Sequence, residues 1–181
     1  MTFAQTWDVS CGTDDGASAD PAPLASPASA ACLGPALPQC PPELAAATPG
    51  GLRKVLLAIG PESARVARDF TTSTLSDWQL DSLAQEAVLI ASELVTNAIR
   101  HGSEGLKGSR VELAWQRQAT KVICMVTDRS PLPPVLGSAG KDAESGRGLQ
   151  VVQALAATWG WMMLGATSKA VWAALAIPRQ L

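Results

Sequence analysis

Two polar side chains stand one helical turn apart in an otherwise apolar segment. Glu93 and Asn97 lie in a helical pattern from Leu83 to Ile99 whose other positions are mostly Leu, Ile, Val and Ala. Residues at i and i+4 share one helix face, and a carboxylate beside an amide is costly to bury without a purpose. Either a ligand at this face uses the pair, or the pair lies at the domain edge, hydrogen-bonded to a loop.

A second set of candidate residues follows an apolar run. Asp128 comes at the end of a strand predicted over 121–127, where an acid can accept a hydrogen bond from an exocyclic amine. Gly146 and Gly148 open a later helix, and glycines there let backbone N–H groups approach phosphates at the positive end of the helix dipole. A plain helix start is the alternative. The segment is neither a Walker A sequence nor a Rossmann fingerprint, because the Lys-Ser/Thr pair and the third glycine are missing.

The elements that must position these residues follow from apolar runs and turn residues. The helix that carries Glu93 is apolar over most of its circumference, so it should be buried against a sheet. The order β-α-α-β-β-loop-α-β-β predicts an α+β fold, a mixed and mostly antiparallel sheet with helices packed on one face. The expected strands cover 53–59, 110–116, 121–127, 158–164 and 169–177, and the expected helices cover 63–75, 81–101 and 147–157.

Composition separates an N-terminal arm from this domain. The chain has 181 residues, a net charge of -2 and 47% hydrophobic residues, enough for a real core. Residues 1–52 contain no Lys or Arg, and they hold five acids and eight of the 13 prolines. We therefore expect a disordered, acidic, Pro/Ala-rich arm over 1–51 and a folded domain over 52–181.

Charge, hydropathy and cysteine usage exclude several classes of protein. The near-neutral charge argues against direct nucleic-acid binding, and no apolar run reaches the roughly 20 residues of a membrane span. The first residues lack a secretory signal pattern, so we expect a cytoplasmic protein. The single histidine, His101, is expected to interact with the helix C-terminus. The four cysteines match no zinc pattern, and Cys124 is predicted to be a small core residue.

The combination of motifs is more specific than its parts. Ser92-Glu-Leu-Val-Thr-Asn-Ala-Ile-Arg-His-Gly102, Asp128 after a strand, and Gly146-Arg-Gly-Leu149 before a helix occur in one order. The domain resembles the GHKL ATP-binding superfamily, which has the Bergerat fold. Within that superfamily it is most similar to the bacterial anti-sigma-factor serine/threonine-protein kinases. The resemblance covers about 52–177 and leaves the arm outside.

The resemblance implies a role for each matching residue. It implies that Asn97 coordinates Mg²⁺ and that Glu93 is the general base that takes the proton from a serine hydroxyl. It implies that Asp128 reads the adenine amino group of ATP. The phosphate cradle that it implies comprises Gly146, Arg147, Gly148 and Leu149. Such an arrangement suits phosphoryl transfer, which needs positioning and charge neutralisation more than covalent help.

Two positions depart from the family pattern. Ser130 stands where the adenine-side motif has its first glycine, and we expect it to be one of the nucleotide-binding residues. Ala170 is taken as the position at which the late strand usually carries a threonine that supports the adenine site. Both departures favour weaker nucleotide binding than in a full member.

The resemblance implies a kinase that sequesters a sigma factor and phosphorylates a serine of an anti-anti-sigma antagonist. The intact pair of Glu93 and Asn97 favours this function. The alternative, favoured by Ser130 and Ala170, is a nucleotide-responsive binding module without kinase activity. A third reading is an interaction domain that no longer binds ATP. A homodimer is left open, and the sequence does not identify the sigma factor or the antagonist.

Overall fold

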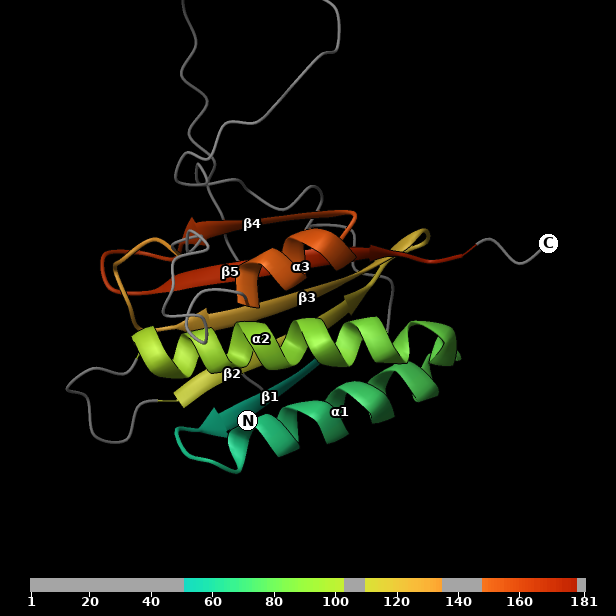
Figure 1. Ribbon diagram of the computed structural model, residues 1–181, viewed down its shortest axis with the longest axis horizontal. Helices are drawn as coiled ribbons and strands as arrows, with labels where there is room; N and C mark the ends of the chain where they lie inside the picture. The colour runs from blue at the N-terminus through green and yellow to red at the C-terminus, as the bar shows by residue number, and fades with distance from the viewer. Residues whose placement is uncertain (1–50, 103–109, 135–147, 179–181) are drawn as a thin grey trace, which may run out of the picture. The chain divides into compact units, whose positions relative to one another are not determined.

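The computed structural model describes residues 51–102, 110–134 and 148–178. Residues 1–50 of the predicted arm lie outside these ranges, as do Gly146 and Arg147. The described part holds five strands, three α-helices and one 3₁₀ turn (Figure 1). In chain order they are β1 (Leu52–Ala58), α1 (Ser63–Asp77), η1 (Asp81–Leu83), α2 (Ala84–Gly102), β2 (Arg110–Arg117), β3 (Lys121–Asp128), α3 (Gly148–Leu155), β4 (Thr158–Met163) and β5 (Lys169–Ala176).

The strands form one sheet in the order β1-β2-β3-β5-β4, and every neighbouring pair is antiparallel. Figure 1 shows α1, α2 and α3 side by side on one face of this sheet. The predicted α+β class, with a mostly antiparallel sheet and helices on one face, is confirmed. The register matters for the site, because β3 and β5 pair so that Asp128 lies opposite Lys169.

The main core lies between the helices and the sheet. Ile90 and Leu94 of α2 pack there with Trp115 and Val126 of the strands, all nearly without solvent exposure. Cys124 belongs to the same core, as the sequence predicts, and burial raises the pKa of its thiol well above the ordinary value. The buried side of α2 contacts α1, α3 and the sheet, as the wide apolar surface of this helix predicts.

The opposite face of the sheet is also apolar. Strand residues alternate between faces, so the side chains that point away from the helices form a second buried cluster. Ile123, Trp172 and Ala170 belong to it. This placement of Ala170 bears on the candidate site.

The helix that opens at Gly148 ends earlier than its sequence pattern predicts. α3 stops at Leu155, two residues before the expected end. The backbone N–H of Ala156 still bonds to the carbonyl of Val152, but that of Ala157 bonds to Ala174 of β5. A sheet hydrogen bond therefore replaces the next helical one, and the chain turns into β4.

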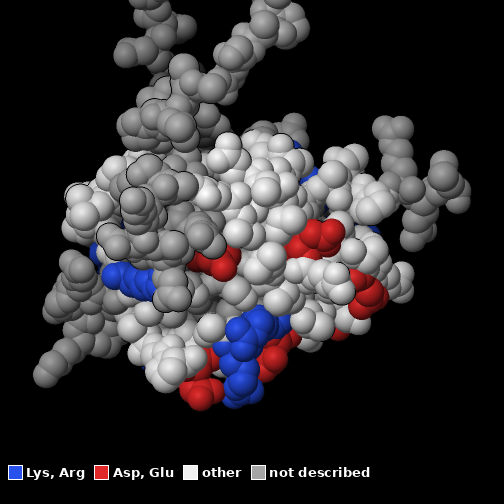
Figure 2. All heavy atoms as spheres, in the orientation of Figure 1, with Lys and Arg blue, Asp and Glu red and all other residues white. Residues whose placement is uncertain are grey.

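Basic and acidic side chains lie next to one another on the surface around α1 (Figure 2). Arg65 pairs with both Glu62 and Asp69 along the exposed side of this helix. Exposed pairs of this kind contribute little to stability. Within the described ranges, none of the helices has the length and apolar character that a membrane span requires.

One buried hydrogen bond links α1 to the sheet. The indole Nε1 of Trp115 donates to Oγ1 of Thr71 at 3.1 Å, and both residues are fully buried. Thr71→Val should lower the free energy of unfolding by about 1–3 kcal/mol, because the indole N–H then loses its acceptor. Urea unfolding measures the effect, with the exposed neighbour Thr72→Val as the matched control. Equal stability of the two variants would contradict the role assigned to this bond.

Candidate functional site

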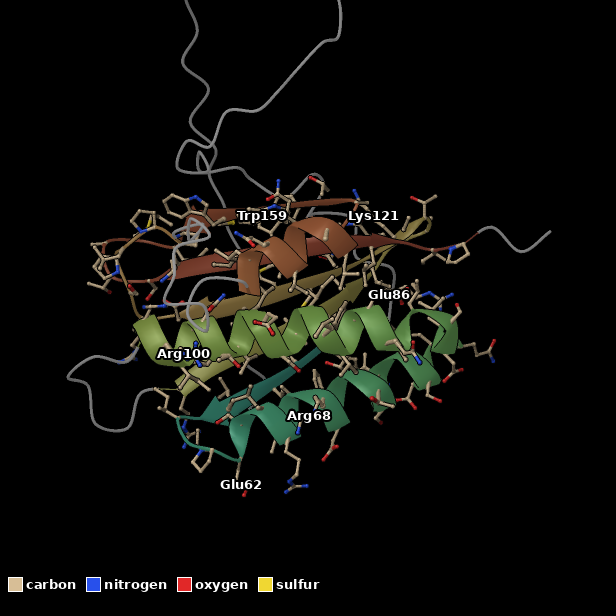
Figure 3. All side chains as sticks on the ribbon, viewed as in Figure 1. Glu62, Arg68, Glu86, Arg100, Lys121 and Trp159 are labelled. Atoms are coloured by element: carbon tan, nitrogen blue, oxygen red, sulfur yellow. The ribbon has the colours of Figure 1, made fainter. Side chains whose placement is uncertain are left out.

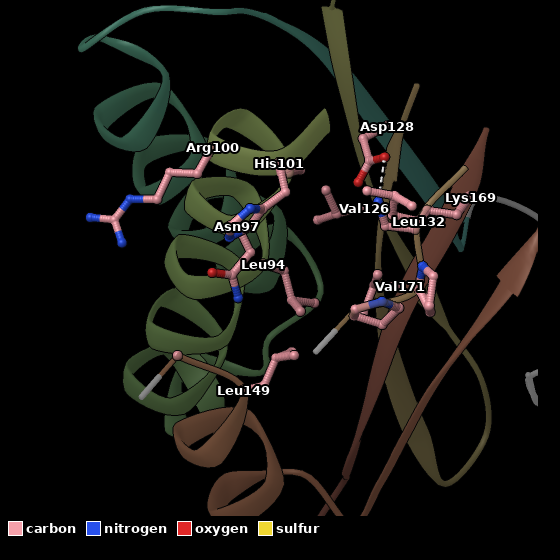
Figure 4. Close-up of a pocket in the computed structure, with 14 residues that line it drawn as sticks. Leu94, Asn97, Arg100, His101, Val126, Asp128, Leu132, Leu149, Lys169 and Val171 are labelled. Atoms are coloured by element: carbon pink, nitrogen blue, oxygen red, sulfur yellow. Dashed lines mark hydrogen bonds and ion pairs between the residues drawn. The ribbon is translucent and has the colours of Figure 1, made fainter. Parts of the chain in front are cut away.

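A cavity of about 320 Å³ lies between the helices and the sheet (Figure 4). Its walls come from α2, the end of β3 with the segment that follows it, the start of α3, and β5. Its lining is mostly apolar: Leu94, Ala98, Val126, Leu132, Pro133, Pro134, Leu149 and Val171. A concave, mostly apolar cavity with a few polar groups is the usual form of a small-molecule site.

Asp128 supplies an acidic group at the sheet side of the cavity. It ends β3, and 3% of its surface is exposed. Its Oδ1 accepts two hydrogen bonds, from Lys169 Nζ at 2.8 Å and from the backbone N–H of Ser130 at 2.9 Å. Burial raises the pKa of this carboxyl, while the bonds from Lys169 and Ser130 act in the opposite direction.

Ser130 stabilises the turn that holds Asp128. Besides its N–H bond to the carboxylate, its own Oγ accepts a hydrogen bond from the N–H of Leu132 at 3.2 Å. The residue is buried. A glycine would supply the first of these bonds but not the second, so the serine adds a side-chain bond to the loop rather than only replacing a smaller residue.

Glu93 and Asn97 meet the first residue of α3. A Cβ placed on Gly148 would lie 2.5 Å from Oε2 of Glu93 and 3.2 Å from Nδ2 of Asn97. The two polar side chains of α2 therefore converge on one point, where the start of the next helix approaches them closely. A glycine avoids this overlap, whereas any Cβ at that point would require the Glu93 side chain to shift. Asn97 also lines the cavity that contains Asp128.

Of the remaining residues that the sequence predicts for the phosphate cradle, the structure describes only Leu149. Leu149 is buried and lines the cavity beside Gly148. Gly146 and Arg147 lie outside the described residues. His101 is exposed in the last turn of α2, where the sequence places it, and it also lines the cavity.

The position taken for the supporting threonine was wrong. Ala170 faces away from the cavity, in the cluster on the opposite side of the sheet. The β5 residues that line the cavity are Lys169 and Val171. The sequence reasoning missed Lys169, although alternation along β5 could have identified it: Val171 is a core residue, and the residue two positions before it must share its face.

Arg100 is a further residue that the sequence reasoning did not place in the site. It lines the mouth of the cavity from α2, three residues beyond Asn97. Its side chain is exposed and points away from the strands (Figures 3 and 4). A cation there is available to groups that approach from solvent.

Comparison with known proteins identifies the class. The family model of the histidine kinase-like ATPase domain matches residues 57–173, and the chain belongs to this family. The matched segment includes both α2 with its polar pair and the strands that form the cavity. It is the GHKL class that the sequence motifs resemble.

Among solved structures, the fold is similar to the RsbU and RsbW domains of Rv1364c from Mycobacterium tuberculosis. The identity is 24%, the TM-score is 0.52, and the match covers 74% of this chain and 34% of that one. This chain thus spans about a third of that protein's structure. Histidine kinase AdeS of Acinetobacter baumannii also matches, at 16% identity and a TM-score of 0.39, over 70% of this chain and 68% of that one. None of the curated proteins compared with the chain matches it.

Proposed function

We propose that this protein is an ATP-dependent serine kinase of the anti-sigma-factor type. The observation that carries the proposal is the convergence of Glu93 and Asn97 on Gly148, at one side of an apolar cavity that also contains Asp128. Family membership supports an ATPase or kinase activity. The similarity to a structure that contains an RsbW domain supports the anti-sigma class.

The adenine of ATP suits the sheet side of the cavity. Leu94, Val126 and Val171 offer apolar surface on which a planar base can pack. The Asp128 carboxylate can accept a hydrogen bond from the exocyclic amine. Because Lys169 and Ser130 hold that carboxylate in place, its orientation is set before the ligand binds.

The phosphates and Mg²⁺ suit the other side, where α3 begins. Gly148 leaves open the space that a Cβ would fill, so backbone N–H groups at the start of the helix can approach phosphate oxygens. Asn97 offers an amide oxygen, a ligand type that Mg²⁺ accepts. Among the described residues no cluster of three or more His, Cys, Asp or Glu forms an alternative metal site. We therefore assign the metal to Asn97 and the substrate phosphates.

We assign the proton transfer to Glu93. In the proposed reaction its carboxylate accepts the proton of a serine hydroxyl, whose oxygen forms a bond to the γ-phosphorus. The bond from that phosphorus to the β–γ bridging oxygen breaks, and ADP leaves. When bound, Mg²⁺ neutralises charge on the phosphates. Arg147 belongs to the proposed phosphate cradle with Gly146.

The proposed partners are proteins. We infer a sigma factor that the domain sequesters in the cytoplasm, and an anti-anti-sigma antagonist that carries the acceptor serine. A homodimer is compatible with the proposal. Neither direct nucleic-acid binding nor a membrane is part of it.

Incubation with γ-labelled ATP and a serine-bearing antagonist tests the proposal. Label on the antagonist serine supports the kinase. ATP binding without transfer to any antagonist would instead support the nucleotide-responsive binding module, which also fits the same cavity. Failure of the full chain to bind ATP would overturn both.

Gly148→Ala provides a prediction specific to the phosphate side. The added methyl group would enter the space proposed for the phosphates and crowd the amide of Asn97, so we expect ATP affinity to fall by about tenfold, within the cost of an overpacked site. Calorimetric titration with ATP measures the loss. Gly60→Ala is the control, because no atom lies within 4 Å of its Cβ position. Unchanged ATP affinity in Gly148→Ala would place the phosphates elsewhere.

A further inference from the structure

Lys169 is a buried charge that the proposed transfer reaction does not use. It begins β5, only 4% of its surface is exposed, and it lines the cavity. A lysine is rarely buried so completely without a specific partner. Its ammonium has three N–H donors, and the one acceptor recorded for it among the described residues is Oδ1 of Asp128. Within the part of the chain that the structure describes, donors therefore remain for a ligand.

The side chains of Asp128 and Lys169 offer hydrogen-bonding atoms of fixed type to the cavity. Both recorded donors to Asp128, Lys169 Nζ and the Ser130 N–H, bond to the same oxygen, Oδ1. Within the described part of the chain, this leaves Oδ2 as an acceptor for a ligand. A hydrogen-bond acceptor thus lies beside a hydrogen-bond donor, both held in a buried ion pair at the sheet side of the cavity.

This pattern matches one edge of adenine. Adenine carries the N6 amino donor beside the N1 acceptor, whereas guanine carries the O6 acceptor beside the N1–H donor. We propose that Lys169 is a specificity-determining residue that donates to N1 of adenine while Asp128 accepts from N6. A guanine in the same orientation would place O6 against a carboxylate oxygen and N1–H against an ammonium. The inference rests on the proposed ATP site and adds a second contact to its base.

A merely structural Lys169 would neutralise Asp128 and touch no ligand. That role predicts that loss of the ammonium weakens every purine nucleotide equally. A direct contact predicts that removal of the ammonium lowers the affinity for ATP, which has N1, more than the affinity for an analogue without N1. The ratio of affinities for ATP and 1-deaza-ATP, which lacks N1, separates the two roles without requiring activity.

The experiment is calorimetric titration of the full chain with ATP, 1-deaza-ATP and GTP. We expect the parent to bind ATP about 10- to 100-fold more tightly than 1-deaza-ATP, as for a hydrogen bond to a charged group. Lys169→Met should bring this ratio close to one. Lys121→Met, which replaces a half-buried lysine of β3 that does not line the cavity, should keep the parent ratio (Figure 3).

Two outcomes would overturn the inference while leaving the proposed function in place. One is a parent that binds ATP and 1-deaza-ATP equally, a result that needs no variant to fold. The other is a folded Lys169→Met that keeps the parent ratio. A parent that binds neither nucleotide would instead overturn the proposed ATP site itself.

Discussion

Glu93→Gln should lower phosphoryl transfer to the antagonist serine by about 10²- to 10⁴-fold, the usual contribution of a general base. Glutamine keeps the size of the side chain and its hydrogen bonding, but it cannot take up the proton of the hydroxyl. ATP affinity should change little, because proton transfer belongs to the transition state and not to ground-state binding. Single-turnover transfer of γ-labelled phosphate measures the first quantity, and titration with ATP measures the second.

The matched control is Glu86→Gln, on the same helix two turns before Glu93 (Figure 3). Glu86 is half-buried like Glu93, but it is not among the nearest atoms that a Cβ on Gly148 would meet. The Glu86→Gln variant should transfer phosphate at the parent rate. A Glu93→Gln variant as fast as this control would show that Glu93 is not the base. A parallel loss of ATP affinity would instead show that Glu93 serves to hold Asn97 or Gly148 in place.

Asn97→Ala should abolish measurable binding of Mg–ATP. Loss of a residue that only supports a metal ligand already costs about 10- to 100-fold in affinity, and here the ligand itself is removed. Asn97→Asp retains an oxygen at the same position, so we expect it to recover part of the Mg²⁺-dependent affinity. Titration of ATP with and without Mg²⁺ measures both effects.

Thr96→Ala serves as the control for this series, because Thr96 is the adjacent half-buried residue of α2 and does not line the cavity. Thermal unfolding should show all three variants folded. If Asn97→Ala bound Mg–ATP like the parent, the metal would have another ligand, and the assignment of the phosphate side would be wrong. Loss of binding in Thr96→Ala as well would indicate damage to the helix rather than to the metal site.

Local patterns were enough to predict the helix that carries the polar pair. Glu93 and Asn97 must share a face of α2 because the helical repeat places i and i+4 together, whatever surrounds the helix. Apolar runs and turn residues likewise predicted the five strands of the described residues, with ends within a few residues of those observed. The motif order then indicated the GHKL family, to which the chain belongs.

The tertiary structure decided which residues meet across the cavity. The contact of Gly148 with Glu93, and the bond of Lys169 to Asp128 across 41 positions of sequence, depend on how separate elements pack. Strand register is the clearest case. A shift of one residue exchanges the two faces of a strand, so the same sequence letters could place Ala170 or Lys169 in the site. Pairing of β5 with β3 places Lys169 opposite Asp128 and buries Ala170 on the far face, because Val171 and Ala173 must join the core beneath the helices.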